Sequence, residues 1–179
     1  FMPEDKSAAD KCLEDMFNIQ SIGLARRMEH IGCKKCVLAV SGGLDSTLAL
    51  LATVKALDFL NIERENLIGV TMPGFGTTGR TYNNAVSLMK ALGISMREIS
   101  IKDACIQHYK DIGHEENNYS VVYEDAQARE RTQIIMDIAN MENGIVVCTG
   151  DMSELALGFT TYNGDHMSMY NVNCGIPKT

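Results

Sequence analysis

The stretch from Val37 to Thr47, VLAVSGGLDST, constrains the fold of this chain more than any other. A short apolar run stops at two adjacent glycines, and a helix-like run begins directly after them. This pattern is typical of a strand that turns into a helix at the edge of a buried parallel sheet. The stretch therefore predicts the first strand-to-helix corner of an α/β domain.

The same alternation continues along the chain. We expect helices over 8–31, 45–57, 83–92, 105–110 and 126–141, strands over 36–40, 67–72, 96–101 and 145–149, and a polar loop over 113–120. The strands are continuous apolar runs, which belong in a parallel sheet that is buried on both faces. The predicted fold class is α/β: a doubly wound parallel sheet with helices on both faces, in one domain over residues 1–179.

Charge and composition exclude several classes of protein. The net charge of −7 argues against nucleic acid as a partner, because phosphate binding needs a basic surface. No apolar run is long enough to cross a membrane, and the first residues lack the apolar core of a signal peptide. Of the six cysteines only Cys33 and Cys36 have CxxC spacing, so we expect reduced thiols in a cytoplasmic protein.

The glycine corner has the chemistry of an anion site. Gly42 and Gly43 let a ligand approach the backbone, and the helix behind them presents unpaired N–H groups. Ser41, Ser46 and Thr47 add hydroxyl groups. No lysine completes a Walker A loop, and the spacing is not that of a dinucleotide fingerprint.

Two carboxylates point to a metal at this corner. Asp45 would repel a phosphate unless a cation lies between them, which suggests Mg²⁺. Glu154 follows the fourth strand, whose end lies at the same edge of the sheet, and it could complete the magnesium site. Two structural alternatives remain open: Asp45 stabilised by the helix dipole, and Glu154 paired with Asp151 in a capping box.

Four blocks of sequence carry a resemblance to a known family. SGGLDS, at 41–46, is similar to the pyrophosphate loop of the ATP pyrophosphatases, which share an adenine nucleotide alpha hydrolase-like fold. Together with 72–85, 123–133 and 146–179, in this order and spacing, it resembles the synthetase part of glutamine-dependent NAD⁺ synthetases. The resemblance implies a ligase that adenylates deamido-NAD⁺ with Mg-ATP, releases pyrophosphate, and amidates the intermediate with ammonia derived from glutamine.

The resemblance also implies the roles of individual residues. The implied ATP-binding residues are Ser41, Gly42, Gly43, Leu44, Asp45, Ser46, Thr47, Thr149 and Lys178, and the implied metal ligands are Asp45 and Glu154. The implied deamido-NAD⁺-binding residues are Asp125, Arg129, Phe159, Thr161, Tyr162 and Asp165. Asp165 is also a candidate base for deprotonating ammonium.

The substrate residues carry structural alternatives and one departure from the family. Asp125 and Arg129 could form an ordinary surface ion pair on a helix, and the loop at 159–165 could be a plain turn with Gly164 in the left-handed conformation. Phe159 or Tyr162 suits stacking on a nicotinate ring. The family usually has asparagine where this chain has Asp125, which puts that hydrogen bond with substrate in question.

The same resemblance implies partners for the chain, and other functions remain as alternatives. The resemblance implies a homodimer, which we expect to use the apolar stripe of helix 8–31, and a parent protein with an upstream glutaminase domain and a further C-terminal segment. Without that segment, the 179 residues alone are expected to turn over little. The rivals are another ATP pyrophosphatase, such as a GMP synthetase-like or tRNA-modifying enzyme, and a nucleotide-binding fragment without catalysis.

Overall fold

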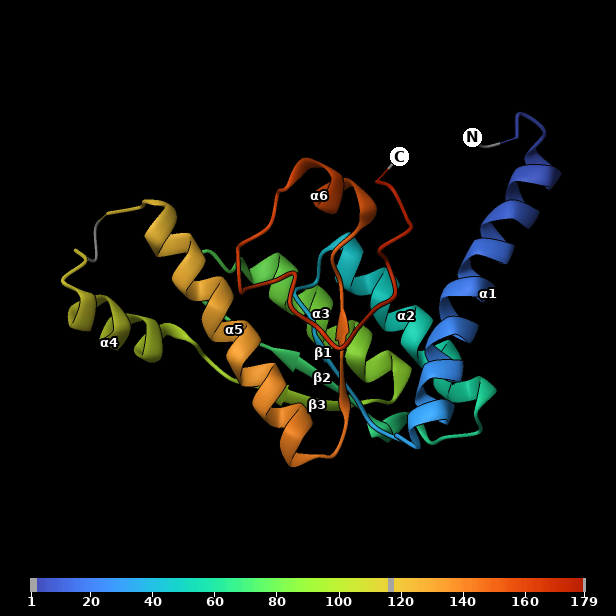
Figure 1. Ribbon diagram of the computed structural model, residues 1–179, viewed down its shortest axis with the longest axis horizontal. Coiled ribbons are helices and arrows are strands. Elements are labelled where there is room, and N and C mark those ends of the chain that lie inside the picture. The colour runs from blue at the N-terminus through green and yellow to red at the C-terminus, as the bar shows by residue number, and fades with distance from the viewer. Residues whose placement is uncertain (1–2, 116–117, 179) are drawn as a thin grey trace.

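A computed structural model describes residues 3–115 and 118–178 as layers of helices around a central sheet (Figure 1). The helices are α1 (Lys6–Ile31), α2 (Leu44–Phe59), α3 (Gly79–Leu92), α4 (Lys102–Ile112), α5 (Val121–Met141) and α6 (Met152–Leu157), with a 3₁₀ turn at Arg64–Asn66. The strands are β1 (Cys36–Ala39), β2 (Leu67–Thr71), β3 (Ser95–Glu98), β4 (Ile145–Cys148) and β5 (Tyr170–Asn171).

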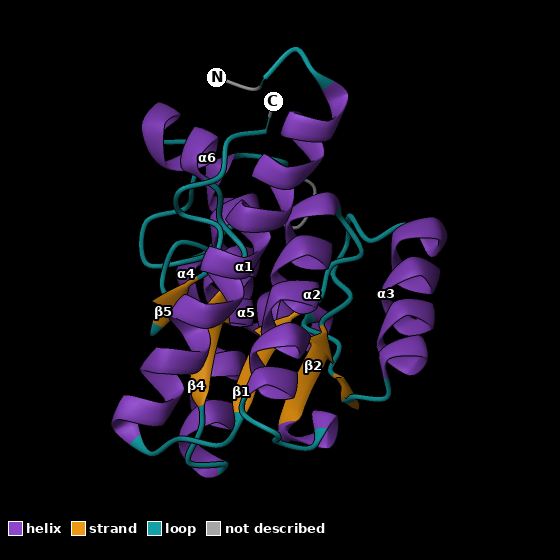
Figure 2. Cartoon of the chain, turned by 90° about the vertical axis from the view of Figure 1, so that its right-hand side faces the viewer, coloured by secondary structure: helices purple, strands orange, loops and turns teal. Residues whose placement is uncertain are grey.

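The sheet has the strand order β3-β2-β1-β4-β5, and every neighbouring pair is parallel (Figure 2). The chain first builds outward from β1 to β3 and then returns to add β4 on the other side of β1. The reversal lies between β1 and β4, where an open α/β sheet has the crevice that holds its ligands. The predicted doubly wound α/β class is confirmed.

Alternate residues of β1, β2 and β4 enter two separate cores. Leu38 and Val147 face α1, α2 and α3, whereas Val37 and Val146 face α4 and α5. The larger buried side chains are divided between these cores: Leu24, Met28, Leu50, Leu57 and Met89 in the first, and Ile101, Tyr109, Ile135 and Ile138 in the second. Burial on both faces explains why these three strands are continuous apolar runs. The expectation of an apolar run was wrong for β3, an edge strand whose sequence is SMRE and which is not buried.

The element boundaries differ from the sequence expectations at several places. α3 begins four residues early because the Thr78 side chain caps it by accepting from the Thr81 N–H. α4 and α5 also begin before the apolar periodicity does, at Lys102 and Val121. β3 ends at Glu98 instead of continuing to Ile101. Of the predicted loop over 113–120, residues 116 and 117 lie outside the described part of the chain.

The short strand β5 was not predicted from the sequence. Its two residues, Tyr170 and Asn171, pair with Val147 and Cys148 and carry neither alternation nor an apolar run. A two-residue strand is set by the edge it docks on, so pattern analysis does not detect it.

Two further features of the chain concern its cysteines and the hydropathy of its helices. The six cysteines are free thiols, and burial together with the nearby Cys33 raises the pKa of the Cys36 thiol. Among the described residues, none of the helices has the length and apolar character that crossing a membrane requires.

Candidate functional site

The glycine corner places β1 and α2 at an angle that requires Gly42. Its φ is +81°, and a Cβ at this position would lie 2.0 Å from the Thr81 carbonyl oxygen. Gly43 has an ordinary φ of −85° and forms the N-cap of α2, where it has no side chain to accept from the first-turn N–H groups. In contrast, α1, α3 and α6 are capped by the side chains of Asp5, Thr78 and Asp151. The uncapped first turn of α2 is therefore open to an external anion.

The predicted hydroxyl groups at the corner are already engaged with the protein. Ser46 Oγ and Thr47 Oγ1 both donate to the Gly43 carbonyl, at 3.1 and 2.8 Å. Ser41 Oγ lies 3.1 Å from Ser46 Oγ and accepts from the Gly43 N–H. These bonds stiffen the loop, and of the three hydroxyl residues Ser41 is the exposed one. Leu44, also predicted to bind ATP, has an exposed side chain and can contribute its backbone N–H.

Asn173 joins the first turn of α2 to the end of β4. Its side-chain amide donates to the carbonyls of Asp45 and Thr149, at 3.0 Å each, and its own oxygen accepts from Gln20 on α1. The residue is 1% exposed, so these bonds are shielded from water. This bridge holds Thr149 next to the first turn of α2.

Three carboxylates converge beside the corner. One oxygen each of Asp45, Asp151 and Glu154 lies within 4.8 Å of the others. The Lys178 ammonium lies among them, 3.2 Å from Asp45, 3.3 Å from Asp151 and 2.9 Å from Glu154. Hydrogen bonding to Glu154 and Asp45 raises the pKa of Lys178. The predicted phosphate-binding lysine therefore occupies the centre of the acidic cluster.

Glu154 satisfies both of the interpretations that the sequence left open. Its Oε2 accepts from the Asp151 N–H at 3.2 Å, and Asp151 accepts from the Glu154 N–H at 2.8 Å, which is a capping box on α6. Its other oxygen, Oε1, accepts from the Lys178 ammonium at 2.9 Å. The capping box thus orients the glutamate and leaves one oxygen for the cluster.

The donor set fits Mg²⁺. Carboxylate oxygens are the ligands that this ion prefers, and it needs only a few of them from the protein. Asp151 adds a third carboxylate to this set, and its buried Oδ2 lies 3.3 Å from the Lys178 ammonium. Burial raises the pKa of Asp151, but the Glu154 N–H and the Lys178 ammonium outweigh it and hold the pKa below its usual range. Asp151 was not among the predicted ligands.

A second network joins α5 to the loop over 159–166. Asp125 accepts from Thr161 Oγ1 at 2.8 Å and from Arg129 at 3.2 Å, and Arg129 also donates to the Tyr162 carbonyl. Asp165 accepts from the Thr161 N–H at 2.7 Å. Five of the predicted substrate residues are thus brought together by the fold.

The aromatic members of this loop point outward. Phe159 is 80% exposed and Tyr162 is 75% exposed, and the Tyr162 ring stacks on His166. The left-handed residue of the turn is Asn163, with φ +56°, and the expectation for Gly164 was wrong. Gly164 instead packs closely against Thr161, which leaves no room for a side chain.

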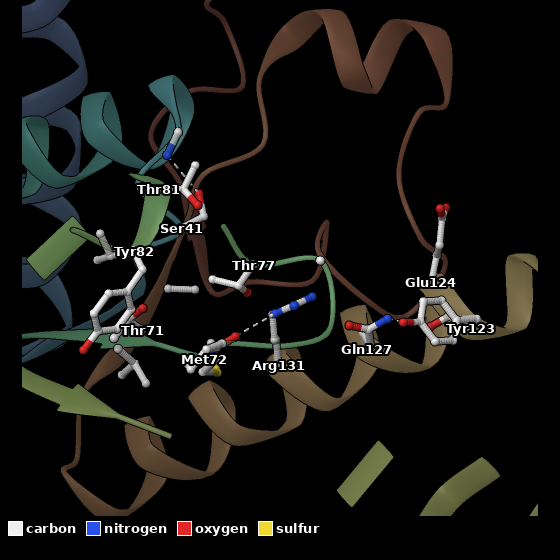
Figure 3. Close-up of a pocket in the computed structure, with 16 residues that line it drawn as sticks. Ser41, Thr71, Met72, Thr77, Thr81, Tyr82, Tyr123, Glu124, Gln127 and Arg131 are labelled. Atoms are coloured by element: carbon white, nitrogen blue, oxygen red, sulfur yellow. Dashed lines mark hydrogen bonds between the residues drawn. The ribbon is translucent and has the colours of Figure 1, made fainter. Parts of the chain in front are cut away.

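Two cavities open on either side of the corner. Cavity A, of about 470 Å³, runs from Ser41 and Gly43 along Val70 and Met72 to Tyr123 (Figure 3). Cavity B, of about 310 Å³, contains Asp45, Thr149, Glu154 and Asp165 in its lining. The residues that line both cavities, within the described part of the chain, are Ala39, Ser41 and Arg131.

Sequence reasoning missed Arg131, Asn173 and Gln127. Gln127 accepts from the Phe75 N–H and donates to the Tyr123 carbonyl, so it anchors the loop after β2 to α5. Arg131 belongs to the QARER block, two residues after Arg129, and therefore lies on a different face of the helix from the one that the sequence analysis followed. The role of Asn173 could not be predicted from the sequence, because its partners Asp45 and Gln20 lie more than a hundred residues away.

These features define a class of protein. A parallel sheet with a reversal between β1 and β4, and an uncapped SGGLDS corner at that reversal, is the fold of the ATP pyrophosphatases that use a pyrophosphate loop. Residues 17–179 match the family model for NAD synthase. This chain belongs to the NAD synthase family.

Relatives and solved structures agree with this assignment. The chain is 43% identical to the glutamine-dependent NAD(+) synthetase of Mycobacterium leprae and 44% identical to that of Mycobacterium bovis, over all of this chain and 27% of each relative. A glutamine-dependent NAD⁺ synthetase from Acinetobacter baumannii, solved with adenosine diphosphate, superposes with a TM-score of 0.83 at 25% identity. That match covers 92% of this chain and 31% of the other. The chain thus spans about a quarter of the length of these curated relatives.

Proposed function

We propose that this chain is the synthetase part of a glutamine-dependent NAD⁺ synthetase, which converts deamido-NAD⁺ into NAD⁺ with ATP and ammonia. The observation that carries the proposal is the junction of cavities A and B at the SGGLDS corner, beside three carboxylates. A reaction between two bound molecules requires two compartments that meet at the reacting atoms. Membership of the NAD synthase family supports the choice of substrates.

The chemistry has two steps. A carboxylate oxygen of the nicotinate group attacks the α-phosphorus of ATP, the bond between the α-phosphorus and the bridging oxygen breaks, and pyrophosphate leaves with the electron pair. Ammonia then attacks the carbonyl carbon of the acyl-adenylate, and AMP leaves as one proton is released. Both substrates are anions, so the protein must neutralise charge and align them.

The geometry supports a specific orientation of ATP. The apolar and aromatic lining of cavity A, which includes Val70, Met72 and Tyr123, suits the adenosine group. The triphosphate then crosses the N–H groups of the first turn of α2 toward Asp45 and Glu154 in cavity B. Thr149 lines this path, and Lys178 can move from the carboxylates to a phosphate.

Asp45, Glu154 and Asp151 would hold Mg²⁺ in this arrangement. Bound there, the ion would supply positive charge to the pyrophosphate leaving group. The deamido-NAD⁺ would enter cavity B from the loop over 159–166, where Phe159 and Tyr162 expose their rings and Arg129 offers a cation. Asp165, which lines cavity B, is the candidate for accepting the proton that ammonia releases.

The test compares substrates in the full-length protein. We expect NAD⁺ to form from deamido-NAD⁺, ATP, Mg²⁺ and either ammonium or glutamine, with one pyrophosphate per NAD⁺. Pyrophosphate release with xanthosine monophosphate, or with tRNA, in place of deamido-NAD⁺ would favour the rival ATP pyrophosphatases. ATP binding without any turnover would favour a nucleotide-binding role only.

Asp125 gives a prediction about substrate affinity. Changing it to asparagine should lower the KM for deamido-NAD⁺ several-fold, because the change removes a negative charge facing an anionic substrate and releases Arg129 from its ion pair. The amide oxygen can still accept from Thr161, so the loop should keep its position. Steady-state kinetics in the full-length protein measures the effect.

A matched control is Asp125→Ala, which removes the charge and also the acceptor for Thr161. It should loosen the loop and raise the KM. A KM that rises equally in both variants would show that the carboxylate itself contributes to substrate binding, in contradiction to the prediction.

We also propose a homodimer formed through α1. The N-terminal part of this helix projects beyond the sheet (Figure 1), whereas Leu24 and Met28 near its other end pack in the core with α2. The apolar side chains exposed at a spacing of three residues along α1 are Leu13, Met16, Ile19 and Ile22. An exposed apolar stripe of this kind is typical of a protein interface. Light scattering should give the mass of a dimer, and Ile19→Lys should shift it toward the monomer. A monomeric mass for the unsubstituted protein at high concentration would exclude this interface.

The remaining proposals concern the whole protein. A glutaminase domain upstream would supply the ammonia, in agreement with the greater length of the relatives that bear the glutamine-dependent name. A cytoplasmic location stays a prediction from the sequence.

A further inference from the structure

One arginine lies where cavities A and B meet. Arg131 extends from α5 toward the loop after β2, and its Nε donates to the Met72 carbonyl at 3.3 Å (Figure 3). One of its terminal nitrogens lies against Gly74, where a Cβ would approach it to 2.7 Å. The side chain is half-buried, and the hydrogen bond to Met72 orients its guanidinium along the loop after β2.

Among the described residues, this guanidinium has no carboxylate partner. Within residues 3–115 and 118–178, no Asp or Glu forms an ion pair with Arg131, and its two terminal nitrogens donate no hydrogen bond. The other arginine of the block, Arg129, is paired with Asp125. Taking a cation out of water without a counter-charge is costly, so such a group is expected to have an anionic ligand as its partner.

The charges of the two cavities make the position of Arg131 significant. The other charged residues that line them are acidic: Glu124 in cavity A, and Asp45, Glu154 and Asp165 in cavity B. Among the described lining residues, Arg131 is the one cation, and it belongs to both linings. Two anionic substrates that approach each other from A and B would therefore meet a single positive charge at the shared wall.

We propose that Arg131 is a catalytic residue that contacts the reacting α-phosphate and the nicotinate carboxylate during adenylation. The inference rests on the proposed function and adds a role that the acidic cluster cannot perform. As the carboxylate oxygen bonds to the α-phosphorus, negative charge builds up on the non-bridging phosphate oxygens. The planar fork of an arginine can donate to a phosphate oxygen and a carboxylate oxygen together. This contact aligns the two anions and neutralises the charge of the transition state.

The test measures each step separately in the full-length protein. Arg131→Met should lower the kcat of pyrophosphate formation roughly 100-fold or more, as expected when one preorganised donor to a transition state is lost. The Kd for Mg-ATP should change less than about threefold, because the loop at Gly42 and the metal site still bind the triphosphate. Arg131→Lys should retain part of the rate, since the ammonium keeps the charge and loses the fork.

Two controls separate catalysis from structure. Arg64→Met removes an exposed arginine whose ion pair with Asp58 lies away from both cavities, and it should leave kcat and KM unchanged. Guanidinium ion added at low, non-denaturing concentration should restore part of the activity of Arg131→Ala, which a purely structural role would not allow. If Arg131→Met does not fold, the rate and rescue comparisons are made with Arg131→Lys and Arg131→Ala.

The outcomes are distinguishable. A kcat that stays within about threefold of the unsubstituted enzyme in Arg131→Met overturns the inference and leaves the proposed function intact. A parallel loss of ATP affinity with unchanged kcat also overturns it, because it assigns Arg131 to ground-state binding. If the unsubstituted protein makes no NAD⁺ from deamido-NAD⁺, the proposed function fails first and this role fails with it.

Discussion

Changing Asp45 to asparagine should weaken Mg²⁺-dependent ATP binding by roughly 100-fold, since a neutral amide oxygen binds Mg²⁺ much more weakly than a carboxylate does. Glu154→Gln should have the same effect, and glutamine can still complete the capping box with Asp151. Both variants should therefore remain folded. Calorimetric titration of the full-length protein with ATP, in the presence and absence of Mg²⁺, measures the change.

The loss of ATP affinity in Asp45→Asn should disappear when no metal is present. With Mg²⁺ removed by a chelator, Asp45→Asn should bind ATP as well as the unsubstituted protein or better, because one negative charge facing the triphosphate is gone. An equal loss of affinity with and without Mg²⁺ would mean that Asp45 supports the loop and not a metal. Glu14→Gln, an exposed change on α1, serves as the control for a general effect of charge.

Substitution of Lys178 should strengthen the binding of a divalent metal ion, in contrast to substitution of Asp45 or Glu154. Its ammonium lies among the three carboxylates, where a metal cation would also bind. Lys178→Met should therefore tighten the binding of Mn²⁺ alone, which electron paramagnetic resonance can follow without nucleotide. Unchanged or weaker Mn²⁺ binding in this variant would show that the cluster does not hold a metal in competition with the lysine.

Gly42→Ala should destabilise the fold by about 3 kcal/mol or more. At φ +81° an alanine is strained, and its Cβ would lie 2.0 Å from the backbone carbonyl oxygen of Thr81 and 3.2 Å from the N atom of Ala85. These atoms belong to α3, so relief requires a shift of the helix. Denaturant titration followed by circular dichroism measures the loss of stability.

The adjacent glycine is a matched control. A Cβ on Gly43 would lie 3.4 Å from Ser41 Oγ, an ordinary contact, and its φ of −85° is open to any residue. Gly43→Ala should change the stability by no more than about 1 kcal/mol. Equal stabilities for the two variants would contradict the assignment of Gly42 as the residue that the corner requires.

Local patterns in the sequence were sufficient to predict the parallel sheet and the glycine corner. The apolar runs at 36–40, 67–72 and 145–149 reflect burial on both faces, which is a property of each strand and is therefore visible in its own residues. Gly32 ends α1 in the left-handed conformation, as expected from its place after the periodic residues. The convergence of Asp45 and Glu154 was also foreseeable, because each follows a parallel strand and such ends share one edge of the sheet.

Only the tertiary structure decided which partner each polar group receives. Lys178 lies among the acidic cluster, and Asn173 joins the first turn of α2 and the end of β4 to α1. β5 forms because an edge of β4 is available to it. Arg131 is one of two arginines in QARER, and nothing in the local sequence distinguishes the one paired with Asp125 from the one at the wall between cavities A and B. Hydrogen bonds and ion pairs between segments more than a hundred residues apart depend on how the helices pack on the sheet. The sequence alone therefore determined the layers and the glycine corner, and packing determined the charges around that corner.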